Sequence, residues 1–170
     1  MNAIILVAQG VQDQEFWYPY YRLQEAGFDV NVVVSGNCAN ITGKYGIPIK
    51  GSCNTNELKH DGFYDVIIIP GGWQAPEIMR QDKKILQFLH KADDDGLLIG
   101  AICHGPQVLI SAGICYNRKM TCYKGMKDDL LNAGAQYVDK PVVVDNNIIT
   151  APHYDNNSDW MREIIKKLNV

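Results

Sequence analysis

The stretch LLIGAICHGPQVLISA at residues 97–112 most constrains what this chain can fold into. Its apolar run Leu97–Ile102 has the length and composition of a buried strand. The run stops at the sequence Cys-His-Gly-Pro, after which apolar residues recur at the spacing of a helix. Because a proline in the first turn of a helix forfeits no hydrogen bond, Pro106 suits the start of that helix. The stretch therefore predicts a strand, a tight turn and a helix.

Cys103 falls on this turn. That placement is typical of a nucleophile elbow, where a reactive side chain sits at the carboxyl end of a parallel strand and the next N–H points at a developing oxyanion. Gly100 and Gly105 leave room for a sharp backbone on either side. The helix N-terminus behind the turn is expected to favour thiolate over thiol. We interpret Cys103 as a nucleophile and the other four cysteines as small buried hydrophobes.

Composition excludes several classes of protein. The 170 residues suit one domain spanning 1–170, with 46% hydrophobic and 21% charged residues. A net charge of −3 without a basic cluster speaks against nucleic acid or an anionic membrane as partner. No apolar stretch approaches the length of a membrane span and no charged segment precedes the first apolar run, so we expect a cytoplasmic protein. The five cysteines contain no CxxC pair, which indicates neither a disulfide framework nor a zinc knuckle.

Apolar runs of strand length alternate with helical patterns along the chain. The expected strands are Ala3–Ala8, Phe28–Ser35, Tyr64–Ile69, Leu97–Ile102 and Lys119–Cys122. The expected helices, besides the one at Pro106, are 13–27, 56–60, 82–92, 127–133 and 159–168. Hairpins are expected within 41–51 and from Val142–Val144 to Ile148–Thr150. This alternation predicts a doubly wound α/β sheet, which binds ligands beyond the carboxyl ends of its strands.

The first of these helices contains a proline. Asp13 is expected to cap its N-terminus and Gly27 to end it. Pro19 lies too far inside to be accommodated without cost, which predicts a kink or an irregular start near Tyr18.

Four motifs make the chain similar to the ThiJ/PfpI family. They are AICHGP at 101–106, PGGxxAPE at 70–77, ExxYP at 15–19 and TGKxG at 42–46. The resemblance covers nearly the whole chain and implies a flavodoxin-like three-layer sandwich, a homodimer that can assemble further and no organic cofactor. It also implies either an intracellular cysteine protease or a glyoxalase III or deglycase acting on methylglyoxal and its adducts. We prefer the small carbonyl as substrate because nothing in the sequence builds an extended groove.

The resemblance assigns roles to particular residues. It places the nucleophile on Cys103, the adjacent histidine on His104 and the acidic partner of the cysteine on Glu15. In this family a glutamate of the adjacent subunit orients the histidine, and that glutamate matches Glu77. For His104, the alternative is a side chain that points away from the nucleophile and matters only through its backbone. For Glu77, the alternative is an ordinary surface acid.

Glu15 is expected to act in proton transfer. If burial keeps Glu15 protonated, it can donate a hydrogen bond to the Cys103 thiolate and later pass a proton to the substrate. The alternative is a carboxylate that only complements a helix dipole. The resemblance implies that the oxyanion donors are the N–H of His104 and one from Gly71 or Gly72.

The sequence departs from the family after its last parallel strand. The family usually carries T-S-R-x-P there, whereas this chain has TAPHYD at 150–155, so an arginine that helps to bind anions is missing. The departure puts in doubt any substrate that carries a carboxylate or phosphate. It also prompts the hypothesis that His153 approaches Cys103, with Asp155 nearby, in a weak echo of the H-x-E of the related amidotransferase fold. The alternative is a histidine on a surface loop.

Two other function classes stay open. In one, Cys103 is a redox sensor that is oxidised to sulfinic acid and read by a partner. In the other, Cys103, His104 and Glu15 hold a metal ion, which adjacent ligands at 103 and 104 disfavour, so we expect no metal. Tyr18 and other aromatic residues, including Trp73, are expected at the pocket mouth or at a dimer face.

Overall fold

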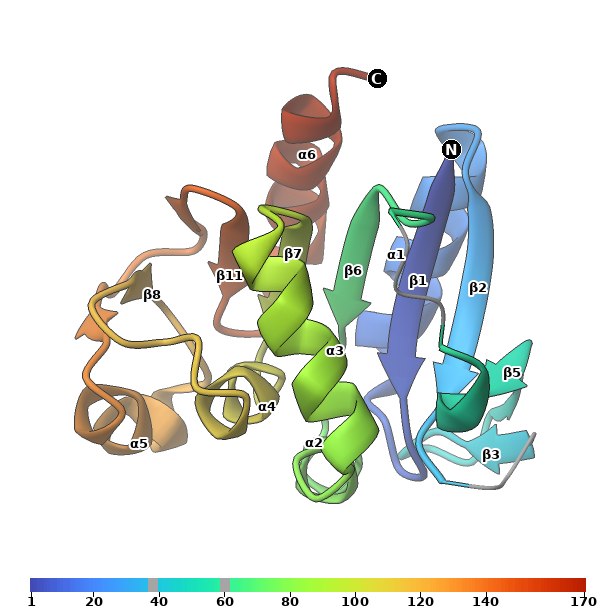
Figure 1. The fold of residues 1–170 in the computed structure, drawn as a ribbon, viewed down its shortest axis with the longest axis horizontal. Coiled ribbons are helices and arrows are strands. Elements are labelled where there is room, and N and C mark those ends of the chain that lie inside the picture. The colour runs from blue at the N-terminus through green and yellow to red at the C-terminus, as the bar shows by residue number, and fades with distance from the viewer. Residues whose placement is uncertain (37–39, 59–61) are drawn as a thin grey trace.

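A computed structural model of the chain describes residues 1–36, 40–58 and 62–170. Within that part of the chain the main sheet has seven strands in the order β10-β11-β7-β6-β1-β2-β5 (Figure 1). All neighbours in it pair in parallel except β10, which is antiparallel to β11. Its strands are β1 Asn2–Val7, β2 Asp29–Val34, β5 Cys53–Asn54, β6 Val66–Ile69, β7 Leu98–Ile102, β10 Val143–Asp145 and β11 Ile148–Ala151.

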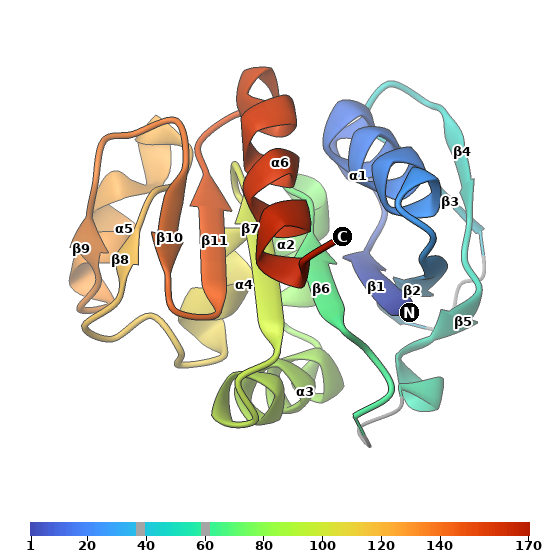
Figure 2. The ribbon, with the colours of Figure 1, turned by 90° about the horizontal axis from the view of Figure 1, so that it is seen from above.

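Helices cover both faces of this sheet. Figure 2 shows α1 (Asp13–Glu25) and α6 (Asn157–Leu168) on one face, and α2 (Gln74–Met79), α3 (Lys83–Asp94) and α4 (Pro106–Ser111) on the other. Because both faces are covered, β6 and β7 are buried along their whole length, which explains their continuous apolar sequences. The predicted doubly wound, flavodoxin-like three-layer sandwich is confirmed.

Smaller elements lie around the sandwich. β3 (Asn40–Thr42) and β4 (Pro48–Lys50) form the antiparallel hairpin expected within 41–51. The strand expected at Lys119–Cys122 is shorter: β8 spans Lys119–Met120 and pairs in parallel with β9 (Gln136–Tyr137), which the sequence pattern did not reveal. α5 spans Lys127–Asn132, and two short 3-10 helices, η2 and η3, span Lys124–Met126 and Tyr154–Asn156.

Two predictions concern residues that lie partly or wholly outside the described part of the chain. In place of the helix expected at 56–60, the described part contains a 3-10 turn, η1, at Thr55–Glu57. Positions 59 and 60 lie outside the described residues, as does Cys38, one of the cysteines interpreted as buried hydrophobes.

The start of α1 differs from the prediction. Gln12, not Asp13, occupies the N-cap position, and its side chain makes no capping hydrogen bond. Asp13 is instead buried and accepts a hydrogen bond from the N–H of Tyr45 at 2.8 Å. The helix runs without a break from Asp13 through Pro19, so the irregular start expected near Tyr18 is wrong. Pro19 deprives the carbonyl of Glu15 of its helical donor, and the burial of the proline ring compensates for that loss.

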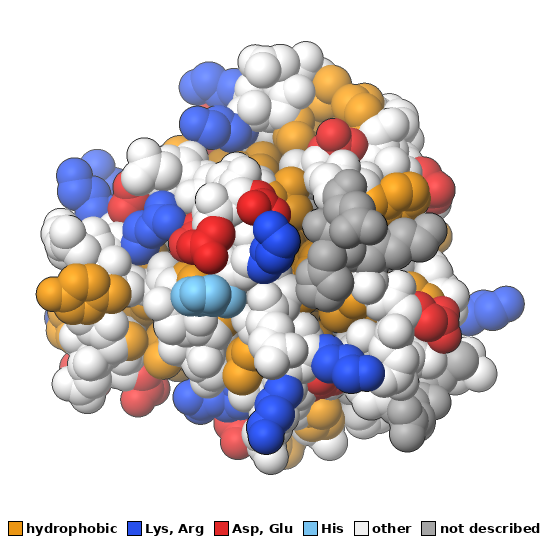
Figure 3. Space-filling model, viewed as in Figure 1, with side chains coloured by type: hydrophobic (Ala, Val, Ile, Leu, Met, Phe, Trp, Pro, Cys, Tyr) orange, Lys and Arg blue, Asp and Glu red, His pale blue; other side chains and the backbone are white. Residues whose placement is uncertain are grey.

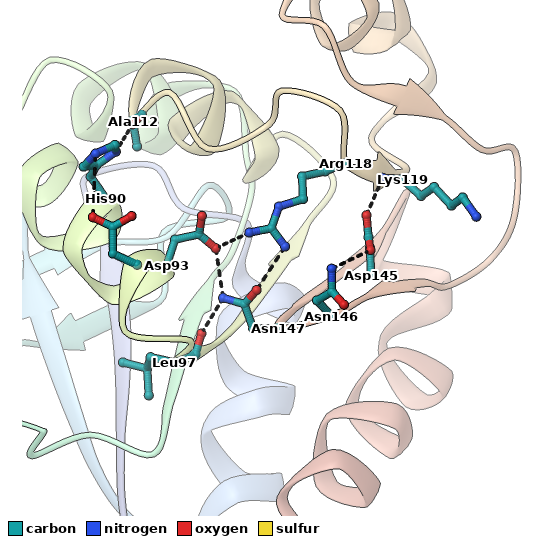
Figure 4. Close-up of polar contacts among 10 residues, drawn as sticks. His90, Asp93, Leu97, Ala112, Arg118, Lys119, Asp145, Asn146 and Asn147 are labelled. Carbon is teal, nitrogen blue, oxygen red and sulfur yellow. Dashed lines mark hydrogen bonds and ion pairs between the residues drawn. The ribbon is translucent and has the colours of Figure 1, made fainter.

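A partly buried polar network ties the amino end of β7 to the edge of the sheet (Figure 4). One carboxylate oxygen of Asp93 accepts hydrogen bonds from Arg118 at 2.7 Å and from Asn147 at 2.9 Å. Arg118 also donates to the side-chain oxygen of Asn147 at 3.1 Å, and Asn147 donates to the carbonyl of Leu97 at 3.1 Å. Since these residues come from α3, the segment before β8 and the turn before β11, the network fixes three separate parts of the chain.

The surface carries both signs of charge. Figure 3 shows acidic and basic side chains interspersed over one face, with hydrophobic side chains in separate smaller areas. Within the described residues, no helix combines the length and apolar character that crossing a membrane requires.

Candidate active site

Loops from four strands meet at the carboxyl edge of the sheet. They surround a cavity of about 290 Å³, whose lining includes Gln12 after β1, Gly72 after β6, Cys103 after β7 and His153 after β11. β1 and β6 are neighbours in the sheet, although their connections leave in opposite directions, toward β2 and toward β7. Such a switch point is where doubly wound sheets bind ligands, so the topology itself places a binding site here.

Cys103 has the strained backbone of a nucleophile elbow. Its φ angle is +60°, and the other non-glycine residues with positive φ in the described part of the chain are all asparagines, which tolerate this conformation. The amide of Cys103 donates to the carbonyl of Ala151 at 2.9 Å, and its own carbonyl accepts from the N–H of Tyr123 at 2.9 Å. A side chain at Gly105 would run into the carbonyl oxygen of Ile69, so the predicted need for glycine beside the turn is met. These contacts hold the strained turn in place.

Glu15 lies fully buried beside the cysteine. Its Oε2 accepts a hydrogen bond from the N–H of Gly71 at 2.8 Å. Its Oε1 is buried without a hydrogen-bond partner among the described residues, and the carboxyl group interacts with the Cys103 thiol. A Cβ at position 71 would lie 2.7 Å from Oε2 of Glu15 and 2.8 Å from Cβ of Cys103, so only glycine allows this close approach.

Burial sets the proton affinity of Glu15. It raises the pKa of the carboxyl group to about 7, against smaller opposing effects from the Gly71 N–H, the Cys103 thiol and the positive charge of Lys44. Near neutral pH both protonation states of Glu15 are therefore populated. A carboxyl group with this pKa can both accept and return a proton, as the sequence interpretation required.

The thiol of Cys103 is also held in its protonated form. Burial raises its pKa first, followed by the adjacent Glu15 carboxylate, while the N–H groups of Gly72 and His104 lower it by less. The expectation that the helix behind the turn favours thiolate is therefore wrong for the unliganded site. α4 contains only six residues, and its dipole does not outweigh desolvation and a neighbouring negative charge. Cys103 and Glu15 form a coupled pair in which the carboxylate can take the thiol proton.

His104 turns toward the cysteine. Its Nδ1 lies 3.3 Å from Sγ of Cys103, so the alternative that its side chain points away is contradicted. The ring stacks on Tyr123, with centroids 4.7 Å apart and planes 23° apart. Burial, and then the charge of Lys44, lower the pKa of His104, which keeps the imidazole neutral near pH 7. A neutral ring beside the sulfur is able to accept a proton.

The geometry separates the two glycines considered as oxyanion donors. The Gly71 N–H is already bonded to Glu15, whereas the N–H groups of Gly72 and His104 interact with the Cys103 sulfur and act to lower its pKa. Gly72 has a φ of +91°, and a Cβ there would lie 2.7 Å from the carbonyl oxygen of Gly10. Gly72 and His104 therefore supply the pair of amides at the sulfur, and Gly71 holds the carboxyl group.

Glu77 lies away from the cysteine of its own chain. It projects from α2 with 55% of its side chain exposed, accepts a hydrogen bond from Gln107 at 3.1 Å and lies 3.7 Å from Arg80. The role implied for it lies in the site of a neighbouring subunit and stays a prediction.

His153 reaches the cavity but does not bond to the cysteine. Its ring lines the same cavity as Cys103, lies 3.0 Å from the carboxylate of Asp155 and packs on Tyr154 with centroids 3.8 Å apart. Among the described residues, no hydrogen bond joins His153 to Cys103, whose ring partner is His104. Asp155 lies beside His153 as expected, and the hypothesis that His153 approaches Cys103 stays a prediction, supported by the cavity that the two residues share.

Tyr18 occupies a different place. With Trp17 and Tyr21 it lines a groove of about 800 Å³ between α1 and η3, which shares Tyr154 with the lining of the Cys103 cavity. Tyr18 is not among the residues that line the Cys103 cavity, so its expected place at the pocket mouth is not observed, and the alternative of a place at a dimer face stays a prediction. Trp73, by contrast, lines the Cys103 cavity and is 66% exposed.

No group of three or more His, Cys, Asp or Glu residues in the described chain is placed to hold a metal ion, which counts against the metal-site alternative.

Sequence reasoning missed several residues of the cavity wall. Lys44 and Tyr45 line it, and the N–H of Tyr45 is held by the buried carboxylate of Asp13. The adjacent Gly43 packs against Asp13 so closely that a side chain there would collide with the carboxylate. The motif TGKxG at 42–46 was the available signal. Lys44 brings a positive charge to a site that lacks the family arginine.

Comparison with known proteins agrees with this geometry. The model of the DJ-1/PfpI family matches residues 1–167. The chain belongs to the DJ-1/PfpI family. It is 40% identical to "Deglycase PfpI" of Pyrococcus furiosus and 41% identical to "Deglycase TK1284" of Thermococcus kodakarensis, each over 168 residues that cover 99% of both chains. These relatives identify the chain as an enzyme of the DJ-1/PfpI family.

Solved structures of DJ-1/PfpI proteins share its fold. A two-domain protein of Anabaena variabilis, with DJ-1/ThiJ/PfpI-like and ferritin-like domains, superposes with a TM-score of 0.95 at 34% identity. The match covers 99% of this chain and 50% of that one. Schizosaccharomyces pombe DJ-1 superposes with a TM-score of 0.90 at 22% identity, over 98% of this chain and 91% of that one, a similarity of fold alone.

Proposed function

We propose that this DJ-1/PfpI enzyme uses Cys103 as a nucleophile on small reactive carbonyls, converting methylglyoxal to lactate and releasing it from its adducts with amines and thiols. The observation that carries the proposal is the buried Cys103–Glu15 pair, with two backbone N–H groups directed at the sulfur. The cavity of about 290 Å³ suits a molecule of a few heavy atoms better than an extended peptide. The similarity to two deglycases supports the same substrate class.

The reaction begins with proton transfer. The Glu15 carboxylate takes the proton of the Cys103 thiol as the sulfur bonds to the aldehyde carbon, C1. The electron pair of the carbonyl bond moves to its oxygen, which accepts hydrogen bonds from the N–H groups of Gly72 and His104. Glu15 returns the proton to that oxygen, and the product is a hemithioacetal. An amine adduct enters at the same stage, since the sulfur replaces the amine at C1 and the amine leaves with a proton.

Isomerisation and hydrolysis complete the conversion. A base removes the hydrogen of C1 as a proton, the electrons form an enediol between C1 and C2, and reprotonation at C2 leaves a thioester with a C2 hydroxyl group. The distance of 3.3 Å between the imidazole of His104 and the sulfur supports His104 as the group that moves this proton. Water then attacks the thioester, releasing lactate and restoring the thiol. The sum is methylglyoxal plus water to lactate, with no change in oxidation state overall.

The experiment is turnover by the purified protein. We expect lactate from methylglyoxal in the wild type and a loss of at least about 1,000-fold in Cys103→Ser, because the weaker nucleophile lacks a low-barrier route to the hemithioacetal. Cys122→Ser is the matched control, since Cys122 is a buried cysteine outside the cavity. No lactate from the wild type would overturn the proposal. Cleavage of unstructured peptides without lactate would favour the protease, and oxidation of Cys103 without any turnover would favour the redox sensor.

Location and assembly belong to the same proposal. We expect the enzyme to work in the cytoplasm as a homodimer or a larger homo-oligomer, in which Glu77 of one subunit orients His104 of the next. The exposure of Glu77 on α2 supports its availability to a neighbouring subunit.

A further inference from the structure

The side chain of Gln12 is a buried polar group without an evident structural task. The residue is 4% exposed, and it lines the same cavity as Cys103. Its amide oxygen, Oε1, is buried and has no hydrogen-bond partner among the described residues. Because buried polar groups in folded proteins nearly always find partners, a group left unpaired in a cavity wall points to a ligand that supplies one.

The backbone of Gln12 is already fully used. Its N–H donates to the carbonyl of Gly71 at 3.2 Å, and its carbonyl accepts from the N–H groups of Glu15 and Phe16, both at 3.1 Å. Gln12 occupies the N-cap position of α1, yet its side chain does not cap the helix. Short polar side chains are favoured there because they can reach back to the first turn. A long, buried polar side chain on the cavity wall is therefore not explained by the helix.

The same contacts fix where the side chain starts. A Cβ at Gly72 would lie 2.8 Å from the backbone nitrogen of Gln12, so the two segments are packed as closely as glycine allows. Gly72 carries one of the two N–H groups that point at the Cys103 sulfur. Gln12 thus lies on the cavity wall beside Gly72, whose N–H is one of the two proposed to bind the oxygen of a reacting carbonyl.

We propose that Gln12 is a specificity-determining residue whose amide oxygen accepts a hydrogen bond from a hydroxyl group on the carbon next to the one bonded to Cys103. The inference rests on the proposed function and names the ligand class within it: compounds with a hydroxyl group adjacent to the reacting carbon. In the proposed reaction the C2 oxygen becomes such a hydroxyl group in the enediol and remains one in lactate. A neutral acceptor suits this group because it discriminates hydroxyl from hydrogen or methyl without favouring a charge.

The test compares two acids of equal charge that differ in this hydroxyl group. Wild-type protein is alkylated with iodoacetamide in increasing concentrations of lactate or of propionate, and modification of Cys103 is quantified by mass spectrometry. Fragment ions must place the label, because Cys115 lies on the same tryptic peptide, residues 92–118. We expect lactate to protect Cys103 at a concentration about tenfold lower than propionate, the size of one net hydrogen bond.

Variants assign the preference to the side chain. Gln12→Met keeps the length and removes the acceptor, so lactate and propionate should protect it equally. Gln12→Glu keeps an acceptor oxygen, and although its charge weakens both anions, the ratio between them should remain. Gln14→Met is the matched control, because Gln14 lies in the same helical turn but lines the other groove, and it should keep the tenfold preference.

Two results would overturn the inference: equal protection by lactate and propionate in the wild type, or a tenfold preference that survives in Gln12→Met. Neither measurement requires turnover. A wild type that makes no lactate from methylglyoxal but shows the preference would sink the proposed function and keep the binding role of Gln12. A wild type that turns over without the preference would do the reverse.

Discussion

The two edges of the central sheet differ in how their polar side chains are paired: those at the amino edge are partly buried and bonded, and those at the carboxyl edge are fully buried and incompletely bonded. At the amino edge, Asp93, Arg118 and Asn147 bond to one another, and none of their side-chain atoms is buried without a partner. At the carboxyl edge, Glu15 is buried with a raised pKa and Gln12 keeps an unpaired amide oxygen. Leaving a buried polar group unpaired costs about 1–3 kcal/mol. The hydrogen bonds at the amino edge therefore stabilise the fold, whereas the unpaired groups at the carboxyl edge lower its stability. The difference identifies the carboxyl edge as the one shaped for a ligand.

The largest expected effect is a gain of stability from Glu15→Gln. The pKa of Glu15 in the folded protein is about 7, against 4.5 for an ordinary glutamate. Below pH 4.5 the group is protonated in both the folded and unfolded states. As pH rises toward 7 the unfolded chain releases the proton first, so wild-type stability falls. Glutamine does not titrate, and above pH 7 the variant should exceed the wild type by about 3 kcal/mol.

Urea denaturation at pH 4 and pH 8 measures this difference. Glu25→Gln, an exposed residue at the end of the same helix, is the control and should shift stability equally little at both pH values. If the Glu15→Gln protein is no more stable than the wild type at pH 8, then the ionised Glu15 does not lower the free energy of unfolding, contrary to the prediction.

The amino edge should respond in the opposite direction. Asp93→Ala leaves Arg118 and Asn147 without their shared acceptor, and we expect a loss of about 2 kcal/mol in the free energy of unfolding. Because the network lies at the far end of β7, kcat/KM at 25 °C should stay within about twofold of the wild type. Asp94→Ala, whose side chain is 69% exposed, is the adjacent control and should cost under about 0.5 kcal/mol. A large loss of activity in Asp93→Ala at unchanged stability would show that the amino edge serves activity and not stability, and would contradict the comparison.

The pH dependence of turnover sharpens the comparison further. If the Glu15 carboxylate accepts the Cys103 proton, kcat/KM should fall about tenfold per pH unit below pH 7, where the pKa of Glu15 lies, and level off above it. Burial lowers the pKa of His104, so the titration of that ring lies further into the acid range than that of an ordinary histidine. Steady-state rates of lactate formation from pH 5 to pH 9 provide the measurement. A flat profile, or one that Glu15→Gln reproduces, would assign the proton to another group.

The smallest expected effect concerns assembly. Glu77→Gln should lower kcat about fivefold, because a neighbouring subunit would orient His104 less well, and should leave the free energy of unfolding within about 0.5 kcal/mol. Glu163→Gln on α6 serves as the matched acidic control. Light scattering reports the oligomeric state of each protein. If the wild type is monomeric and Glu77→Gln leaves turnover unchanged, a neighbouring subunit does not contribute to the site.

Local sequence patterns predicted most of the strands and helices. The strands β1, β6 and β7 were predicted to within a residue or two, because strands buried on both faces must be apolar throughout. Two short elements were not predicted: β9, whose two residues are too few for an alternating pattern, and the six-residue helix α2. The start of α1 was also misjudged, because Asp13 is a good capping residue by type but bonds to the loop at Tyr45 instead.

The sequence by itself determined that Cys103 stands on a strained turn between a buried strand and a helix, because the apolar run, the glycine and the proline act on neighbouring residues. Only the tertiary structure decided which Gly amide faces the sulfur, that Gln12 lines the cavity and that Tyr18 does not. Those outcomes depend on distances between loops that follow different strands. Such distances follow from strand order and packing, which no local pattern encodes.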